Sequence, residues 1–257
     1  MRLAAVLFLG LALVACGVTR QARDVRQSGF LGDYSRLEPG PDGGARKLYQ
    51  NPNAKLGSYD KILLAPVTIW TGEGSEMNDL AKEDRQRVAN RLFELLHARL
   101  SKDYAIVTAP GPGVLRVEAA ITSAERSYPV LDTVSTIVPI GLGISTLKAV
   151  ATGKPTFVGE ATAEMRLSDA ATGEVLAEAV DSRVGTKNPT GLFDKWEDVD
   201  SALTYWTDRL GYKLCVERGA AGCVAPLTAT GSRTTRIFSQ RSPALYSVGS
   251  AGFVSST

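Results

Sequence analysis

Two amphipathic helical segments, each bordered by strand-like stretches, constrain the fold of this chain more than any other feature. Residues 78–101 and 196–214 carry apolar side chains at intervals of three and four, and their stripes consist of Val88, Leu92, Leu95, Leu96, Leu100, Val199, Leu203, Trp206, Leu210 and Leu214. Such spacing lines one face of a helix, and that face must be buried against another element. Each segment therefore predicts a helix packed on a sheet.

Strand-like segments lie before and between the two helices. Apolar, β-branched or alternating patterns cover 61–70, 104–109, 114–126, 157–167 and 174–183. The turn from Asp169 to Gly173 predicts a hairpin, because a glycine there supplies the positive φ that closes it. We therefore predict an α+β fold in the order β-α-β-β-loop-β-β-α, with two helices packed on a mostly antiparallel sheet.

The rest of the chain has no apolar period. Residues 16–58 are rich in glycine, proline and charged residues, which predicts a flexible tether. Residues 224–257 are rich in serine, threonine, glycine and alanine, which predicts a disordered, weakly basic tail. We therefore expect a single α+β domain over 59–223 with flexible ends.

The first sixteen residues have the organisation of a secretory signal that ends in a lipidation site. Arg2 precedes an apolar run, and Leu13-Val14-Ala15 leads directly into Cys16. A signal peptide over 1–15, removed so that Cys16 carries diacylglycerol and palmitate, fits this order, and a plain cleavable signal with an incidental cysteine is the alternative. The apolar run is too short for a membrane-spanning helix, which needs about 20 residues. Gly17, in place of an aspartate, favours the outer membrane with the domain facing the periplasm.

The charge balance and the cysteine content limit the possible partners and cross-links of the protein. The chain has 29 basic and 27 acidic residues, and this near balance argues against a nucleic-acid partner. Besides Cys16, the cysteines are Cys215 and Cys223. In the oxidising periplasm such a pair predicts a disulfide, with two free thiols or half a metal site as the alternative. Their spacing fits no common zinc pattern.

Catalytic side chains are scarce. His97 is the one histidine, and it lies off the apolar stripe of its helix, so we expect it on the solvated side. Nucleophilic triads that need a histidine could be built only around it. Acids gather at the start of the second helix, where the helix dipole favours them more simply than a calcium site does: they are Asp194, Glu197, Asp198 and Asp200. We predict no enzyme, no cofactor and no metal site.

Residues 130–152 form the most unusual segment, because they carry no charge between Asp132 and Lys148. An apolar segment of this kind must be buried, paired with a partner or placed in lipid, and all three interpretations stay open. Trp196, at the start of the second helix, is a further candidate for a partly exposed contact. The candidate partner-contact residues are Ile137, Val138, Ile140, Leu142, Ile144 and Trp196.

Short motifs in a fixed order extend over residues 28–214, among them Ser28-Gly29-Phe30-Leu31, Tyr59-Asp60-Lys61, Pro66-Val67, Gly153-Lys154, Thr172-Gly173-Glu174 and Trp196. In order and spacing they resemble a family of proteobacterial lipoproteins known as domain of unknown function thirty-three thirteen. The resemblance implies a lipoprotein but no particular activity, since the family has none assigned. More distantly, the order of elements is similar to that of small periplasmic lipoprotein domains that activate or assemble envelope machines.

Our first hypothesis is a non-catalytic outer-membrane lipoprotein that binds an envelope protein or peptidoglycan through its tethered domain. One alternative is a carboxylate-dependent hydrolase of cell-wall or polysaccharide material, which would need a pair of acids brought together by the fold. Another is a carrier of an apolar ligand that uses residues 130–152.

Overall fold

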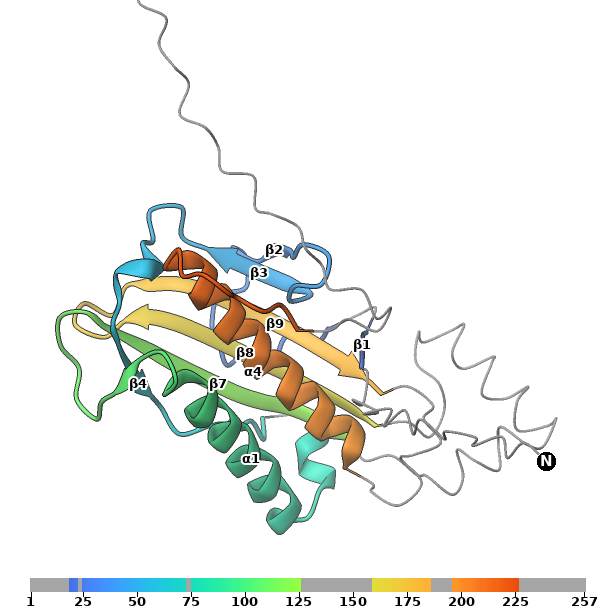
Figure 1. The fold of residues 1–257 in the computed structure, drawn as a ribbon. Coiled ribbons are helices and arrows are strands. Elements are labelled where there is room, and N and C mark those ends of the chain that lie inside the picture. Colours follow the sequence, from blue (N-terminus) through green and yellow to red (C-terminus); the bar gives the residue numbers. More distant parts are fainter. Residues whose placement is uncertain (1–18, 23–24, 73–74, 126–158, 186–195, 227–257) are drawn as a thin grey trace, which may run out of the picture.

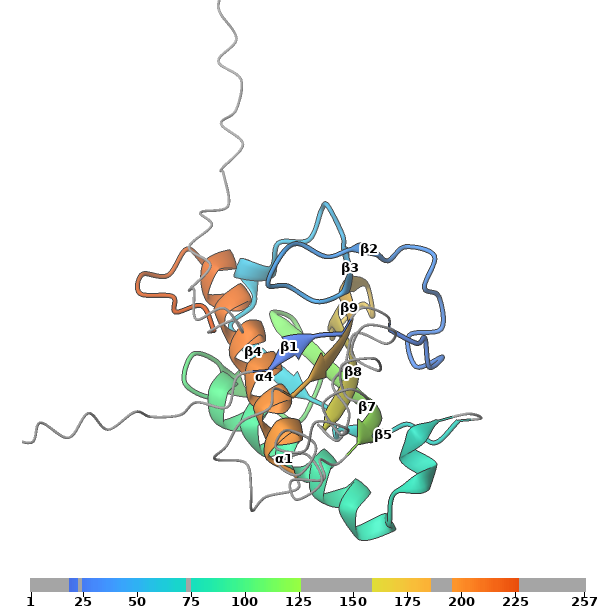
Figure 2. The same ribbon diagram turned by 90° about the vertical axis from the view of Figure 1, so that its right-hand side faces the viewer.

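Two helices lie on one face of a single mixed sheet (Figures 1 and 2). This computed structural model describes residues 19–22, 25–72, 75–125, 159–185 and 196–226. Helix α1 is Lys82–Leu100 and helix α4 is Glu197–Glu217, and they pack side by side. Within the described residues the sheet has nine strands, most of them antiparallel to their neighbours, so the predicted α+β class is confirmed.

The long strands form the centre of the sheet. They are β7 (Val114–Glu125), β8 (Glu160–Asp169) and β9 (Val175–Val184), and each is antiparallel to the next. Beyond β7 lie short parallel strands: β4 (Lys61–Leu64), β5 (Thr68–Ile69) and β6 (Ala105–Ile106). Pro66 lies between β4 and β5, because proline cannot donate a hydrogen bond to the sheet. The described strands and helices from β4 to α4 thus follow the predicted order, and the predicted loop between β7 and β8 lies outside the described residues.

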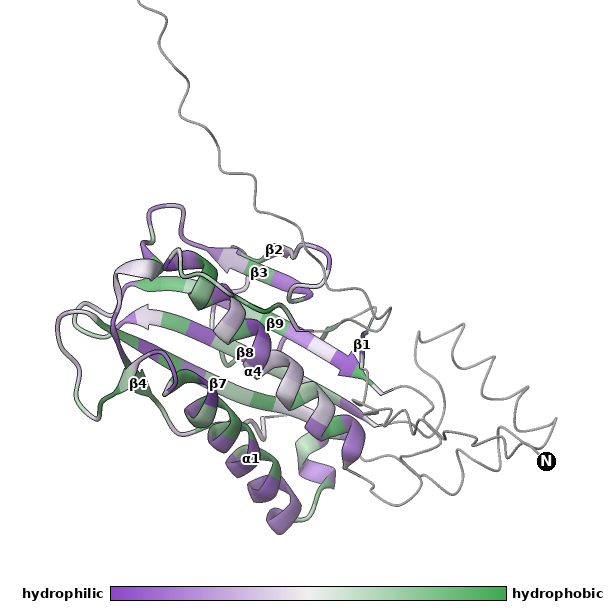
Figure 3. Ribbon diagram, viewed as in Figure 1, coloured by the Kyte–Doolittle hydropathy of each residue, from purple (hydrophilic) through white to green (hydrophobic). Residues whose placement is uncertain are grey.

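The hydrophobic core lies between the helices and the sheet. Leu92 and Leu96 of α1, together with Leu203 and Leu214 of α4, are buried against Leu115 and its neighbours in β7. Figure 3 shows the polar residues of α1 on its outward side. His97 lies there, exposed as expected. A buried leucine in such a core contributes about 2–5 kcal/mol relative to alanine, so the two stripes hold the layers together.

The predicted tether over 16–58 is wrong for the described part of that range, which belongs to the sheet. Strand β1 (Arg20–Gln21) and strand β3 (Lys47–Gln50) both pair with β9, and β2 (Glu38–Pro39) pairs with β3. A short 3₁₀ helix, η1 (Leu56–Ser58), then precedes β4. These elements are too short to show a period, so turn-forming residues dominated the sequence pattern.

Helix boundaries differ slightly from those expected. A separate 3₁₀ turn, η2 (Glu76–Asp79), precedes α1, and the hydroxyl of Ser75 accepts the N–H of Met77 at its start. Cys215, in the last turn of α4, forms a disulfide with Cys223, and their Cα atoms are 5.7 Å apart. Among the described elements no helix is long and apolar enough to cross a membrane. Cys16, the segment 130–152 and residues 227–257 lie outside the described residues.

Candidate functional site

Three strands and β1 meet in one row across the end of the sheet. Arg20 pairs with Val184, Val184 with Glu160, and Glu160 with Glu125. We call this row the anchor end, because Arg20 lies four residues after Cys16. An extended chain covers at most about 3.5 Å per residue, so the four steps from Arg20 back to Cys16 can span at most roughly 14 Å.

The opposite end of the sheet is the β8–β9 hairpin. Its turn runs from Asp169 to Glu174, and Gly173 adopts the positive φ of 77° that the sequence predicted. Strand β8 has ten residues, so the hairpin lies roughly 30 Å from the anchor end at about 3.3 Å per residue. The two ends of the sheet are therefore far apart compared with the reach of the chain before Arg20.

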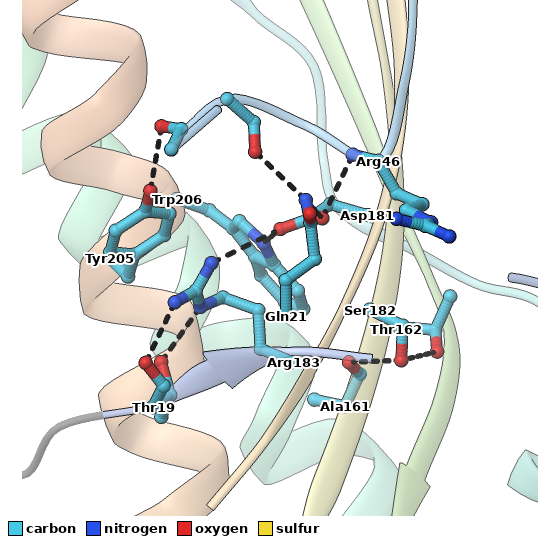
Figure 4. A network of polar contacts seen from close by, with 12 residues as sticks. Thr19, Gln21, Arg46, Ala161, Thr162, Asp181, Ser182, Arg183, Tyr205 and Trp206 are labelled. Atoms are coloured by element: carbon cyan, nitrogen blue, oxygen red, sulfur yellow. Dashed lines mark hydrogen bonds and ion pairs between the residues drawn. The ribbon is translucent and has the colours of Figure 1, made fainter. Parts of the chain in front are cut away.

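A buried carboxylate fixes β1 to the helices (Figure 4). Asp181 of β9 accepts hydrogen bonds from Gln21 Nε2 at 2.7 Å, Arg46 N at 3.0 Å and Trp206 Nε1 at 2.8 Å. Burial raises the pKa of the Asp181 carboxyl, while these donors and the nearby Arg183 favour its charged form. One side chain thus joins β1, the loop before β3 and α4.

Arg183 of β9 makes the second connection to β1 (Figure 4). Its guanidinium donates to the hydroxyl of Thr19 at 2.7 Å and to the carbonyl of Thr19 at 2.8 Å, and it lies 3.6 Å from the ring centroid of Tyr205. The Tyr205 hydroxyl in turn donates to the carbonyl of Gly43 at 2.8 Å. Burial lowers the pKa of Arg183, and the aromatic face and Asp181 compensate its charge. Thr19, three residues after the predicted lipid site, is therefore firmly held.

Two further buried acids hold the N-terminal segment on the opposite face of the sheet. Glu164 accepts the backbone N–H of Ser28 at 2.9 Å and the hydroxyl of Tyr34 at 2.6 Å. Glu178 forms ion pairs of 2.9 Å with both Arg36 and Arg166. Both carboxylates are fully buried, and their partners satisfy them as a buried charge requires. Residues 28–36 therefore cover the face that the helices leave free.

An apolar cavity of about 360 Å³ lies between α4 and the helix-facing side of β8 and β9. Its floor includes Ala163, Met165 and Ala179, and α4 contributes Trp206 and Leu210. Asp181, at the edge of the cavity, is already bound by the donors described above. The cavity is thus an apolar space with polar groups only at its margins.

Of the six predicted contact residues, the structure describes Trp196. Trp196 is half-buried, packs against the core and lines a shallow surface pocket beside Arg91. The other five, Ile137, Val138, Ile140, Leu142 and Ile144, lie outside the described residues, as does Cys16. The disulfide partners Cys215 and Cys223 lie at the hairpin end of α4, far from Arg20.

The acids at the start of α4 have structural partners. Asp198 accepts the backbone N–H of Gly159 at 2.8 Å, and Asp200 forms an ion pair of 2.6 Å with Arg91. Asp194 lies outside the described residues. In the described part of the chain no three potential metal ligands come together.

Sequence reasoning missed Asp181, Arg183, Glu164 and Glu178. One signal in the sequence could have found them. Charged residues occur inside the segments predicted as central strands, β8 and β9. Charged side chains are seldom buried without a partner, so their presence in central strands indicates covering polar segments. Their partners in the N-terminal segment lie more than a hundred positions away, 130 in the case of Tyr34 and Glu164, and a pattern of neighbouring residues cannot find them.

A mixed sheet with two helices on one face and an N-terminal segment on the other defines the class of this α+β domain. The chain belongs to the family described as "Protein of unknown function (DUF3313)", whose profile matches residues 26–210. The match begins within the N-terminal segment that the sheet incorporates. The family expected from the short motifs is confirmed.

Solved structures of two bacterial proteins are similar to this chain at low sequence identity. One is a PelC dodecamer from Paraburkholderia phytofirmans, with 14% identity, a TM-score of 0.35, and coverage of 67% of this chain and 96% of that chain. The other is a protein of the DUF330 family from Xanthomonas campestris, with 10% identity, a TM-score of 0.35, and coverage of 66% and 92%. No curated protein matches this chain.

Proposed function

We propose that this protein is a non-catalytic outer-membrane lipoprotein whose domain is held close to the periplasmic face of the membrane, where it binds another envelope component. The observation that carries the proposal is the pairing of Arg20 and Gln21 with β9, only four residues after Cys16. An acylated Cys16 would bring the anchor end of the sheet to the lipid surface. The domain would then be a body fixed at the membrane rather than one on a long tether.

The residues around β1 support this arrangement. Arg183 and Asp181 bind Thr19 and Gln21, so the part of the chain held against the sheet begins three residues after Cys16, the proposed lipid site. A short connection keeps the domain at a high effective concentration for partners in the same membrane. Two or three acyl chains make such an anchor stable, whereas one chain would be reversible.

The buried acids support a non-catalytic role. A glycoside hydrolase needs two carboxyl groups that converge on one substrate bond. Here Asp181 faces the helices, whereas Glu164 and Glu178 face the N-terminal segment, and each accepts hydrogen bonds that join parts of the fold. These three acids therefore hold elements of the fold together.

Lipidation and location are tested together in a Gram-negative host that expresses the full chain. We expect the wild-type protein to incorporate labelled palmitate and to sediment with outer membranes, and Cys16→Ser to lose both properties. Label that persists in Cys16→Ser, or wild-type protein in the soluble fraction, contradicts the proposal.

Partner binding is tested by photo-crosslinking in the same cells. A crosslinking residue at Ile140, within the candidate contact segment, is compared with one at Ala171 in the exposed hairpin turn. We expect Ile140 to capture an envelope protein or peptidoglycan in wild type and to lose that product in Cys16→Ser. Equal products from the two positions, or none from Ile140, would argue against the proposed partner contact.

A further inference from the structure

Near the hairpin, the helix-facing side of β9 is less well covered than its other side. Ala177 and Ala179 point toward the helices and are half-buried, whereas Glu178 and Val180 point away from them and are each 1% exposed. The cause is the distribution of covering elements: residues 28–36 lie on the outer face over Glu164 and Glu178, while α1 packs on β5 and β7 and α4 contacts β8 more than β9. Space therefore remains beneath α4 at the β9 side of the sheet.

Small side chains keep this space open. Ala163, Ala177 and Ala179 lie on its floor, where leucine or valine would fill much of the volume. Most of the remaining lining is apolar and includes Leu48 and Met165, while Gln50, Glu178 and Asp181 also line the cavity. The cavity volume of about 360 Å³ lies at the lower end of the range of roughly 300–1,000 Å³ that small-molecule sites occupy.

The margin of the cavity carries positive charge from α4. Arg209 and Lys213 are one helical turn apart, and both line the cavity. Lys213 is bound by Glu217 at 2.6 Å and by Gln50 at 3.1 Å. Among the described carboxylates Arg209 has no ion-pair partner, and its guanidinium lies 5.6 Å from the ring centroid of Tyr212. An apolar interior thus adjoins a cation available to an anion.

We propose that this cavity binds one alkyl chain of a single-chain amphiphile with an anionic headgroup, a fatty acid or a monoacyl phospholipid. The chain lies over Ala177 and Ala179, and the carboxylate or phosphate lies at Arg209, where a guanidinium can form two parallel hydrogen bonds. A cavity of this size holds one chain and excludes a second. The site is separate from the proposed partner contact and does not depend on the location of the protein.

Binding is measured with the full lipidated chain in phosphatidylcholine nanodiscs, by calorimetry against octyl, decyl and dodecyl phosphate, with empty nanodiscs as the blank. We expect saturable binding of one molecule per chain, with affinity rising up to about fourfold per added methylene until the cavity is full. Octyl glucoside, which has the octyl tail and a neutral head, should bind at least tenfold more weakly than octyl phosphate. Equal affinity for the two heads, or signal no larger than the blank, overturns the proposal.

Three variants separate the tail site from the head site. Ala179→Leu should lower the affinity for every alkyl phosphate at least tenfold, and Ala171→Leu, which adds the same group in the exposed hairpin turn, should leave it unchanged. Arg209→Gln should weaken alkyl phosphates about tenfold and leave octyl glucoside unaffected. Because Arg209 lies at the margin, that variant keeps the test valid even if Ala179→Leu unfolds. Unchanged affinity in Arg209→Gln, or an equal loss in Ala171→Leu and Ala179→Leu, would show that the amphiphile binds elsewhere.

Discussion

At the scale of single residues, Asp181 is a buried carboxylate that joins three parts of the fold. Replacing it in Asp181→Ala leaves Trp206 Nε1 without its acceptor and leaves the buried charge of Arg183 without its nearest carboxylate, which lies 3.7 Å away. Uncompensated buried charges cost about 3–5 kcal/mol, and we expect a loss of that size in the free energy of unfolding, measured with urea. Asp208→Ala, on the exposed side of α4, is the matched control and should change it by no more than about 0.5 kcal/mol. A similar small change in Asp181→Ala would mean that the network adds nothing to stability.

Tyr59 gives the protein a defined alkaline response. Burial first, and then the hydrogen bond of 2.9 Å from its hydroxyl to Asp169, raise the pKa of Tyr59 from 10.0 to about 12. The folded state thus favours the neutral phenol, so this contribution to stability is complete below pH 10 and is lost as the pH rises toward 12. We expect wild type to lose stability over that window more steeply than Tyr59→Phe. Ultraviolet titration of the folded proteins should show the difference as one late-ionising tyrosine, and superimposable curves would refute the assignment.

At the scale of elements, the start of α4 is fitted against the anchor end of the sheet by two glycines. Gly185 donates its N–H to the carbonyl of Gly159 at 2.8 Å, and Gly159 donates to the carboxylate of Asp198. A Cβ atom at Gly185 would overlap the Asp198 carboxyl. Glycine at these two positions therefore lets the ends of β8 and β9 pack closely against Asp198 in the first turn of α4.

We expect Gly185→Ala to lower the free energy of unfolding by about 1–3 kcal/mol, the usual effect of overpacking, because the Asp198 carboxylate must move and give up its hydrogen bond with Gly159. Gly111→Ala is the control, since a Cβ there meets nothing within 4 Å. Urea unfolding of the two variants beside wild type measures the difference. Equal stability of Gly185→Ala and Gly111→Ala would show that α4 adapts without strain.

The sequence predicts the larger elements well because long elements show periods. Helix α4 was expected over 196–214 and spans Glu197–Glu217, and β7 was expected over 114–126 and spans Val114–Glu125. Strands β1 and β2 have two residues each, too few to show any alternation. Strand β1 is attached by buried charges whose partners are distant in sequence, such as Arg183 and Thr19, 164 positions apart, and β2 is attached by pairing with β3. The candidate cavity escaped prediction for a related reason, since it depends on which face of β9 the helices cover.

At the scale of the whole molecule, the two ends and the two faces of the sheet are distinct. The N-terminal segment covers the part of the outer face over Glu164 and Glu178, and the inner face carries the helices and the cavity. The anchor end holds β1 and the ends of β7 and β9, whereas the hairpin end holds the β8–β9 turn and the disulfide at the end of α4 (Figure 1). A lipid on Cys16 would therefore orient the long axis of the strands relative to the membrane.

That orientation can be measured on the lipidated chain in liposomes that carry a headgroup quencher. Fluorophores are attached singly at Arg20→Cys, which is exposed at the anchor end, and at Ala171→Cys in the hairpin turn. We expect strong quenching at position 20 and weak quenching at position 171, because the two ends lie roughly 30 Å apart along β8. A long Gly-Ser linker inserted between Gly17 and Val18 should remove the difference, since a flexible linker lets the domain rotate freely. Equal quenching without the linker, or stronger quenching at position 171, would mean that β1 does not set the orientation of the domain.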